Sequence, residues 1–116
     1  MKASTGTPWL VRLYDEFGRH TLAYRGEKTI FDDKGERTTT AIAVSQGPAH
    51  FTLSEWHEYR LVCIGNHLSV YVDGILVSEA IDNDPAQQDF TGILALQLHS
   101  GPPMTVQFKD ITLKKL

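Results

Sequence analysis

The sequence lacks several features that particular kinds of protein depend on. Its 116 residues contain one cysteine, Cys63, so an internal disulfide and a multi-cysteine zinc site are excluded. This cysteine falls in an alternating apolar stretch and is expected to be buried and unreactive. No apolar run approaches the roughly 20 residues of a membrane-spanning helix. The opening MKASTGTPWL lacks the apolar segment of a signal peptide, so the default expectation is a cytoplasmic protein.

Clustered positive charge is also missing. The chain has 11 lysines and arginines against 14 aspartates and glutamates, a net charge of −3, with no basic cluster. Nucleic acids and anionic membranes bind through such clusters, so neither is expected as the main partner. The length suits a single domain over residues 1–116 with a modest core, and residues 1–8 are expected to be disordered.

Several catalytic and metal-binding motifs are incomplete. His57-Glu58 begins like the zinc motif H-E-x-x-H, but Leu61 stands where the second histidine would be. Residues 82–84 (DND) begin like a calcium loop, yet the later ligand positions do not match, and turns capped by aspartate side chains explain them better. A glycine-rich phosphate loop after a strand and a G-x-S-x-G nucleophile motif are both absent from the sequence.

What the sequence does contain is a succession of short strand patterns separated by turn residues. These patterns predict strands over residues 9–14, 19–24, 28–31, 37–44, 58–64, 67–72, 75–80, 91–99 and 105–113. A hairpin tip is expected at residues 33–36, and no stretch shows a convincing helical period. Many short strands with closely spaced turns are typical of an all-β fold, here an antiparallel β-sandwich.

The clearest part is the meander over residues 58–80. Gly65-Asn66 and Asp73-Gly74 are two-residue turns of the kind that needs positive φ. They set a register in which Arg60 faces Tyr71 and Ser69 faces Ser78. One face is then apolar and expected in the core: Tyr59, Leu61, Cys63, Leu68, Val70, Val72, Ile75 and Val77. The other is half polar: Arg60, Val62, Ile64, His67, Ser69, Tyr71, Leu76 and Ser78.

The segment TGILALQLHSGPP at residues 91–103 is predicted to form a central strand that ends at its Gly-Pro-Pro sequence. Alternation puts Leu94, Leu96 and Leu98 on one face, where burial is expected, as it is for Leu61, Val70 and Phe108. Gln97 and His99 end the other face, although burying such groups unpaired costs about 1–3 kcal/mol each. Two explanations remain open: a hydrogen-bonded pair in the core, or the wall of a ligand cleft.

A cleft of this kind suits a carbohydrate. Gln97 and His99 would line it together with Arg60 and Tyr71 from the polar face of the meander. Amide, guanidinium and imidazole groups can bind hydroxyls, while an aromatic ring stacks on the apolar face of a sugar. The sequence therefore predicts a saccharide-like small molecule as the partner.

Several stretches resemble the 3-keto-disaccharide hydrolase domain family. They are LYDEFGRH, W-x-E-Y at residues 56–59, GNHLSVYVDG, the D-N-D-P loop and GILALQLHSGPPMTVQFKDITLKKL, and they span nearly all of the chain from Trp9 on. The resemblance implies a concanavalin-like, jelly-roll sandwich and cleavage of glycosides oxidised at C3. It assigns site roles to His99, Gln97, Tyr14, Asp15, Glu16 and Arg19. Members of this family are often exported.

The family's domain is longer, and its N-terminal part has no counterpart here. The chain is therefore identified as an N-terminally truncated member, and the bare edge that this leaves predicts a homodimer. Two functions follow. In the first, His99 is an acid/base or a ligand of a divalent metal, with Asp15 or Glu16 as the partner in glycoside cleavage. In the second, the sandwich is a non-catalytic carbohydrate-binding or protein-interaction module.

Overall fold

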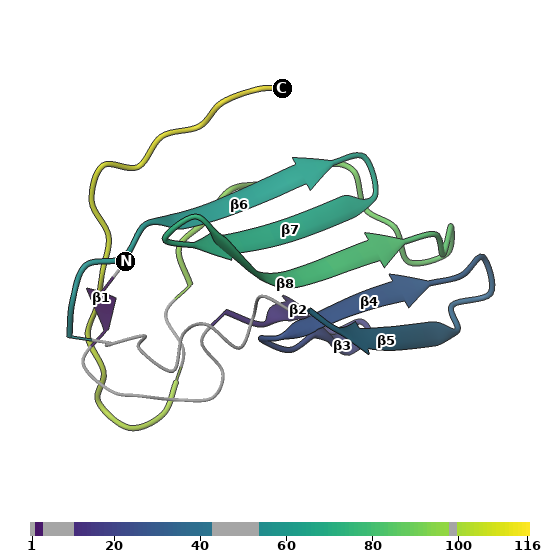
Figure 1. The fold of residues 1–116 in the computed structure, drawn as a ribbon, viewed down its shortest axis with the longest axis horizontal. Coiled ribbons are helices and arrows are strands. Elements are labelled where there is room, and N and C mark those ends of the chain that lie inside the picture. The colour runs from purple at the N-terminus through teal and green to yellow at the C-terminus, as the bar shows by residue number, and fades with distance from the viewer. Residues whose placement is uncertain (1, 4–10, 43–53, 98–99) are drawn as a thin grey trace.

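The structure, a computed structural model, describes residues 2–3, 11–42, 54–97 and 100–116. Its largest element is a five-stranded sheet with strand order β5-β4-β8-β7-β6 (Figure 1). The strands of this sheet are β4 (Glu27–Phe31), β5 (Arg37–Ala41), β6 (Tyr59–Ile64), β7 (His67–Val72) and β8 (Ile75–Asp82). Two short pairs complete the fold: β2 (Leu13–Asp15) with β3 (His20–Ala23), and β1 (Lys2–Ala3) with β9 (Val106–Gln107). The described residues contain no helix, which confirms the all-β sandwich class.

The β4–β5 hairpin forms as predicted because its turn residues suit it. Asp32 Oδ1 accepts hydrogen bonds from the backbone N–H groups of Lys34, at 2.9 Å, and Glu36, at 2.8 Å. Gly35 takes a positive φ of 79°, a conformation that favours glycine. The side-chain cap and the glycine close the tip at the expected place.

The meander β6–β7–β8 also follows the sequence, with one shift. Asp73 and Gly74 both have positive φ, and Arg60 faces Tyr71 as expected. The predicted pairing of Ser69 with Ser78 is wrong, because a bulge between Val70 and Tyr71 moves the register by one residue. Beyond the bulge Ser69 faces Glu79.

One pairing departs from a purely antiparallel sheet, since β4 and β8 run parallel. Two parallel neighbouring strands need a long connection, and here the strands β5, β6 and β7 lie between β4 and β8 in the sequence. The pairing places Lys28 beside Glu79, so opposite charges meet across the two strands.

The core lies on one face of the five-stranded sheet, beneath the β2–β3 pair. Val70, Val72 and Val77 pack with Val11 in one cluster. A second cluster contains the three buried residues Leu22, Phe31 and Ala80, and Leu13 packs against both clusters. Val70 is fully buried, as predicted. Covering this face removes apolar area from water, and that burial is the main contribution to stability.

The predicted core was too wide, because β6 turns out to be an edge strand. On β6, Leu61 is 49% exposed, and Tyr59 and Cys63 are also exposed although they were expected in the core. Ile75, the first residue of β8, is exposed as well. No element of the described chain covers this end of the apolar face, since β2 and β3 contact the other strands.

The predictions for the C-terminal quarter are corrected too. Residues 91–97 form no strand, and Leu94 and Leu96 are 70% and 57% exposed rather than buried. Only β9 forms within residues 105–113, and Phe108 is exposed. Alternation makes these segments able to pair, but the described chain offers them no neighbouring strand beyond β1. Figure 1 shows the last residues as a separate segment on the β6 side of the sheet.

Near the N-terminus, β1 lies in the stretch that was expected to be disordered. The first strand of the β2–β3 pair starts at Leu13, and residues 9 and 10 of its predicted range lie outside the described residues. So do Leu98 and His99. Among the described residues, no helix has the length and apolar character needed to cross a membrane.

Candidate functional site

The β2–β3 turn positions the first functional side chains. Gly18 donates its backbone N–H to the carbonyl oxygen of Asp15, and the backbone N–H of Arg19 donates to Asp15 Oδ2 at 3.0 Å. A side chain at Gly18 would displace the Asp15 carboxylate from this position, so glycine leaves room for it. The turn therefore holds the Asp15 carboxylate beside Arg19.

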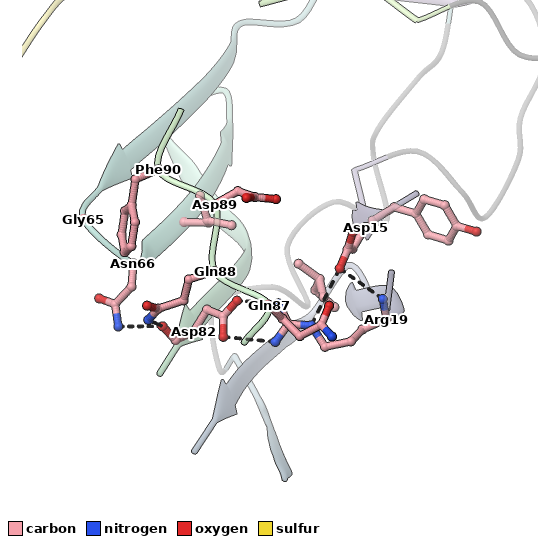
Figure 2. A pocket seen from close by; sticks show the side chains of 12 residues that line it. Asp15, Arg19, Gly65, Asn66, Asp82, Gln87, Gln88, Asp89 and Phe90 are labelled. Carbon is pink, nitrogen blue, oxygen red and sulfur yellow. Dashed lines mark hydrogen bonds and ion pairs between the residues drawn. The ribbon is translucent and has the colours of Figure 1, made fainter. Parts of the chain in front are cut away.

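Arg19 reaches from this turn to the end of β8. Its two terminal nitrogens bind the two oxygens of Asp82, with Nη1 3.0 Å from Oδ1 (Figure 2). Its Nε lies 3.6 Å from Asp15 Oδ2, and its Nη1 lies 3.9 Å from Asp84 Oδ2. The guanidinium also stacks over the Phe31 ring, 4.3 Å from the ring centroid. One cation thus ties the β2–β3 hairpin to β8.

Electrostatics favour the charged state of both partners in this pair. The hydrogen bond from Arg19 lowers the pKa of Asp82, and burial opposes this less strongly. The same bond raises the pKa of Arg19. The two side chains are only 16% and 12% exposed, so water screens their attraction little.

Beside this pair lies a hollow of about 210 Å³. The β2–β3 hairpin, the β6–β7 turn and the chain after β8 surround it, as Figure 2 shows. Its volume is below the about 300–1,000 Å³ of most ligand clefts. A hollow of this size suits one small ring better than a whole oligosaccharide.

The lining of the hollow is mixed, with polar side chains beside the apolar Leu22 and Leu68 and two aromatic residues. Three side-chain amides line it, those of Asn66, Gln87 and Gln88. Asn66 donates to the Asp82 carbonyl oxygen at 2.8 Å, and Gln88 donates to the same oxygen, so β8 anchors both amides. Tyr14 and Phe90 are the aromatic residues of the lining. The Arg12 guanidinium lies over the Tyr14 ring, 4.3 Å from its centroid, and the Tyr14 hydroxyl lies 3.2 Å from His20 Nδ1, so Phe90 is the more accessible ring.

The charge of the hollow also limits what it can bind. Asp15, Asp82 and Asp89 contribute three carboxylates, against the single guanidinium of Arg19. A phosphorylated or sulfated ligand would be repelled by this excess of negative charge. A neutral polyol meets hydrogen-bond donors and acceptors without that penalty.

Three residues that the sequence implicated come together in this hollow: Tyr14, Asp15 and Arg19. Glu16 is exposed and does not line it. Gln97 is exposed on a segment without strand structure, and His99 lies outside the described residues.

Arg60 and Tyr71 lie elsewhere. Their side chains stack on each other, with the guanidinium carbon 4.6 Å from the ring centroid. Tyr71 lies between the buried Val70 and Val72 in β7, so it points to the opposite face of the sheet. The structure therefore separates the predicted pair from the hollow.

A second polar cluster shares that opposite face. Glu79 contacts His67 Nε2, and its other oxygen lies 3.5 Å from Lys28 Nζ. Ser69 Oγ lies 3.3 Å from the same His67 Nε2. Because the serine and the glutamate share one ring nitrogen, the three residues do not form a nucleophile–base–carboxylate relay. The cluster is best understood as pairing the buried Glu79.

Sequence reasoning did not identify Asn66, Asp82, Gln87, Gln88, Asp89 and Phe90 as site residues. The D-N-D-P loop was noticed, and its aspartate-capped turns are present: Asp82 Oδ1 accepts from the backbone of Asp84, and Asp84 Oδ1 from that of Ala86. The pairing with Arg19 spans 63 positions and leaves no local pattern in the sequence. No group of three or more metal-ligating residues occurs in the described part of the chain.

Fold and hollow together define an all-β protein with a small hollow that carries an excess of negative charge. Residues 9–114 match the model of the 3-keto-alpha-glucoside-1,2-lyase-like domain. The chain belongs to this family, as its sequence motifs indicated. No curated protein and no solved structure shows a significant match.

Proposed function

We propose that the hollow binds the sugar ring of a 3-keto glucoside and that the protein cleaves its glycosidic bond. The observation that carries the proposal is the lining, in which amides and carboxylates stand beside the aromatic ring of Phe90 around a space the size of one ring. Amides and carboxylates can bind ring hydroxyls, and Phe90 can pack on the apolar face of a sugar. Membership of a family named for 3-keto-glucoside chemistry supports this substrate class.

The chemistry of such a substrate needs a base near C2. A ketone at C3 acidifies the hydrogen on C2; a base removes this proton, the C1–O bond breaks, and the leaving alkoxide takes up a proton. The products are a C1–C2 unsaturated ketone and an alcohol. Addition of water across the new double bond would complete a net hydrolysis, so a lyase and a hydrolase share this first step.

Asp15 is the proposed base. Its Oδ2 is held by the backbone N–H of Arg19, whereas no hydrogen bond to its Oδ1 occurs among the described residues. The side chain is 28% exposed, so a ligand in the hollow can reach it. His99, two positions after Gln97 in the sequence, is proposed to assist proton transfer or to bind a divalent metal.

The test uses a 3-keto glucoside of p-nitrophenol, whose release is followed by absorbance. Asp15→Asn should lower the rate by about 10²–10⁴-fold, the usual contribution of a general base. Asp33→Asn, an exposed aspartate in the β4–β5 turn, is the matched control and should behave as wild type. Glu16→Gln separates the two adjacent carboxylates: a large loss there and none in Asp15→Asn would overturn the assignment.

A second candidate function is sugar binding without turnover on the same sandwich. The observation in its favour is that Arg19 forms ion pairs with both Asp15 and Asp82. Its hydrogen bond lowers the pKa of Asp82, which weakens that carboxylate as a base. Titration of the unoxidised methyl glucoside and its 3-keto form, followed by NMR, distinguishes the two. Binding of both sugars without any cleavage would favour the binding module.

A further inference from the structure

Strand β6 forms a free edge of the five-stranded sheet. It pairs with β7 on one side, and no described strand pairs with its other side. A row of unpaired backbone N–H and C=O groups is a template for another strand. At the opposite edge, β5 reads RTTTA, so threonines and an arginine occupy that strand. β6 reads YRLVCI, which has a single charge and no proline or glycine.

Several apolar side chains of β6 are also exposed. Leu61 is 49% and Ile64 is 60% exposed, and Tyr59 and Cys63 are exposed beside them. The chain's own apolar extended segment, residues 91–97, does not cover them, because it is itself exposed. Within the described part of the chain, the edge therefore combines backbone groups that pair with no strand and apolar side chains that are exposed.

We propose that β6 pairs with β6 of a second copy, antiparallel across a two-fold axis, so that two five-stranded sheets join into one. Antiparallel partners place opposite side chains on the same face. With the axis normal to the sheet, the apolar set of Tyr59, Leu61 and Cys63 continues directly into the same set of the partner. An isologous contact of this kind closes at two copies, and the β5 edges remain outermost.

The charges of β6 fit this symmetric pairing. If Leu61 faces its own symmetry copy, Arg60 faces the partner's Val62 and Tyr59 faces the partner's Cys63. If the pairing slips by one residue on each strand, Leu61 faces the partner's Cys63 and Arg60 faces the partner's Ile64. The arginines do not meet in either of these registers, whereas a slip in the opposite direction would place Arg60 against its own copy and is disfavoured by like charge.

Mass measurement against concentration gives the first test. A six-residue strand edge makes a small interface, so association should be weak and concentration-dependent. The mass of the wild type should rise from 13.0 kDa toward twice that value in sedimentation equilibrium. Leu61→Lys should remain monomeric, because a charge at a strand edge blocks pairing. Thr39→Lys on β5 is the matched control and should associate as the wild type does.

Cross-linking gives the second test and does not depend on the lysine variant folding. In Leu61→Cys the introduced thiol faces either its own symmetry copy or the partner's Cys63, so mild oxidation should yield a covalent dimer. The wild type and Thr39→Cys should form little covalent dimer under the same conditions. The proposal is overturned if the wild type remains at 13.0 kDa at the highest concentration, if Leu61→Lys associates normally, or if Leu61→Cys cross-links no more than Thr39→Cys.

Discussion

The pair formed by Arg19 and Asp82 offers the most direct test of the structure, through the variant Asp82→Asn. Asparagine keeps the size of the side chain and can still accept the hydrogen bond from the backbone of Asp84, so the change isolates the charge. The guanidinium then loses its bidentate partner at the point where the β2–β3 hairpin meets β8.

The expected cost follows from burial. Removing one member of a buried pair costs about 3–5 kcal/mol, because the remaining charge is left unpaired in a shielded place. Both side chains are less than one fifth exposed, at 16% and 12%, which puts this pair near that regime. Arg19 still has Asp15 and Asp84 nearby, so we reduce the figure to about 2 kcal/mol. For a domain with about 5–15 kcal/mol of stability, such a loss is large.

Urea denaturation measures the free energy of unfolding that the pair contributes. Four proteins are compared: the wild type, Asp82→Asn, Arg19→Met and the double variant. The coupling free energy from this cycle should be about 1–3 kcal/mol at neutral pH. Arg19 lowers the pKa of Asp82, so the stabilisation is complete above the unfolded-state pKa and is lost as pH falls through the folded-state value. The coupling should therefore vanish in acid. Coupling near zero at pH 7, or a cost equal to that of the control Asp33→Asn, would refute the reasoning.

Three further outcomes can be measured in the same way. Gly35→Ala should destabilise the protein more than Gly74→Ala. Both glycines have a φ of 79°, a conformation that costs alanine about 1–2 kcal/mol. Of the two, only at Gly35 would the new Cβ lie 2.8 Å from the Asp84 Oδ2 atom. Val70→Ala should cost about 2–3 kcal/mol, whereas Leu94→Ala should stay within about 0.5 kcal/mol, and a large effect at Leu94 would show that this side chain is buried. Asp73→Asn should lose less stability than the wild type on acidification below about pH 4, because the hydrogen bond with His57 lowers the pKa of Asp73 in the folded state. If the urea midpoints of this variant fall with pH as steeply as those of the wild type, the prediction is wrong.

The local parts of the fold were predictable because they depend on a few neighbouring residues. Asp73-Gly74 demands positive φ, and the turn then fixes which residues face each other until the bulge at Val70. The bulge itself was not predictable, since an extra residue on β8 leaves no mark in an alternating pattern.

Strand order was much harder to predict than strand positions. Leu61 and Val70 share the same alternation and face each other across β6 and β7, yet only Val70 is buried, because β6 is at the edge. The same limit applies to residues 91–97, whose alternation shows that they could pair but not with which strand. Tyr14, Asp15 and Arg19 were found through a family motif, whereas Asp82 joins them across 63 positions of sequence.

The hollow and the free edge meet at the β6–β7 turn, and this links the two proposals. β6 ends at Ile64, and the next two residues, Gly65 and Asn66, line the hollow. Antiparallel pairing places the first residues of one β6 beside the last residues of the other, so the partner's Tyr59 would lie near the rim of each hollow. An added aromatic ring there would strengthen sugar binding. Leu61→Lys changes no lining residue, so weaker sugar binding in that variant would come from loss of the partner, and unchanged binding would mean that each hollow works alone.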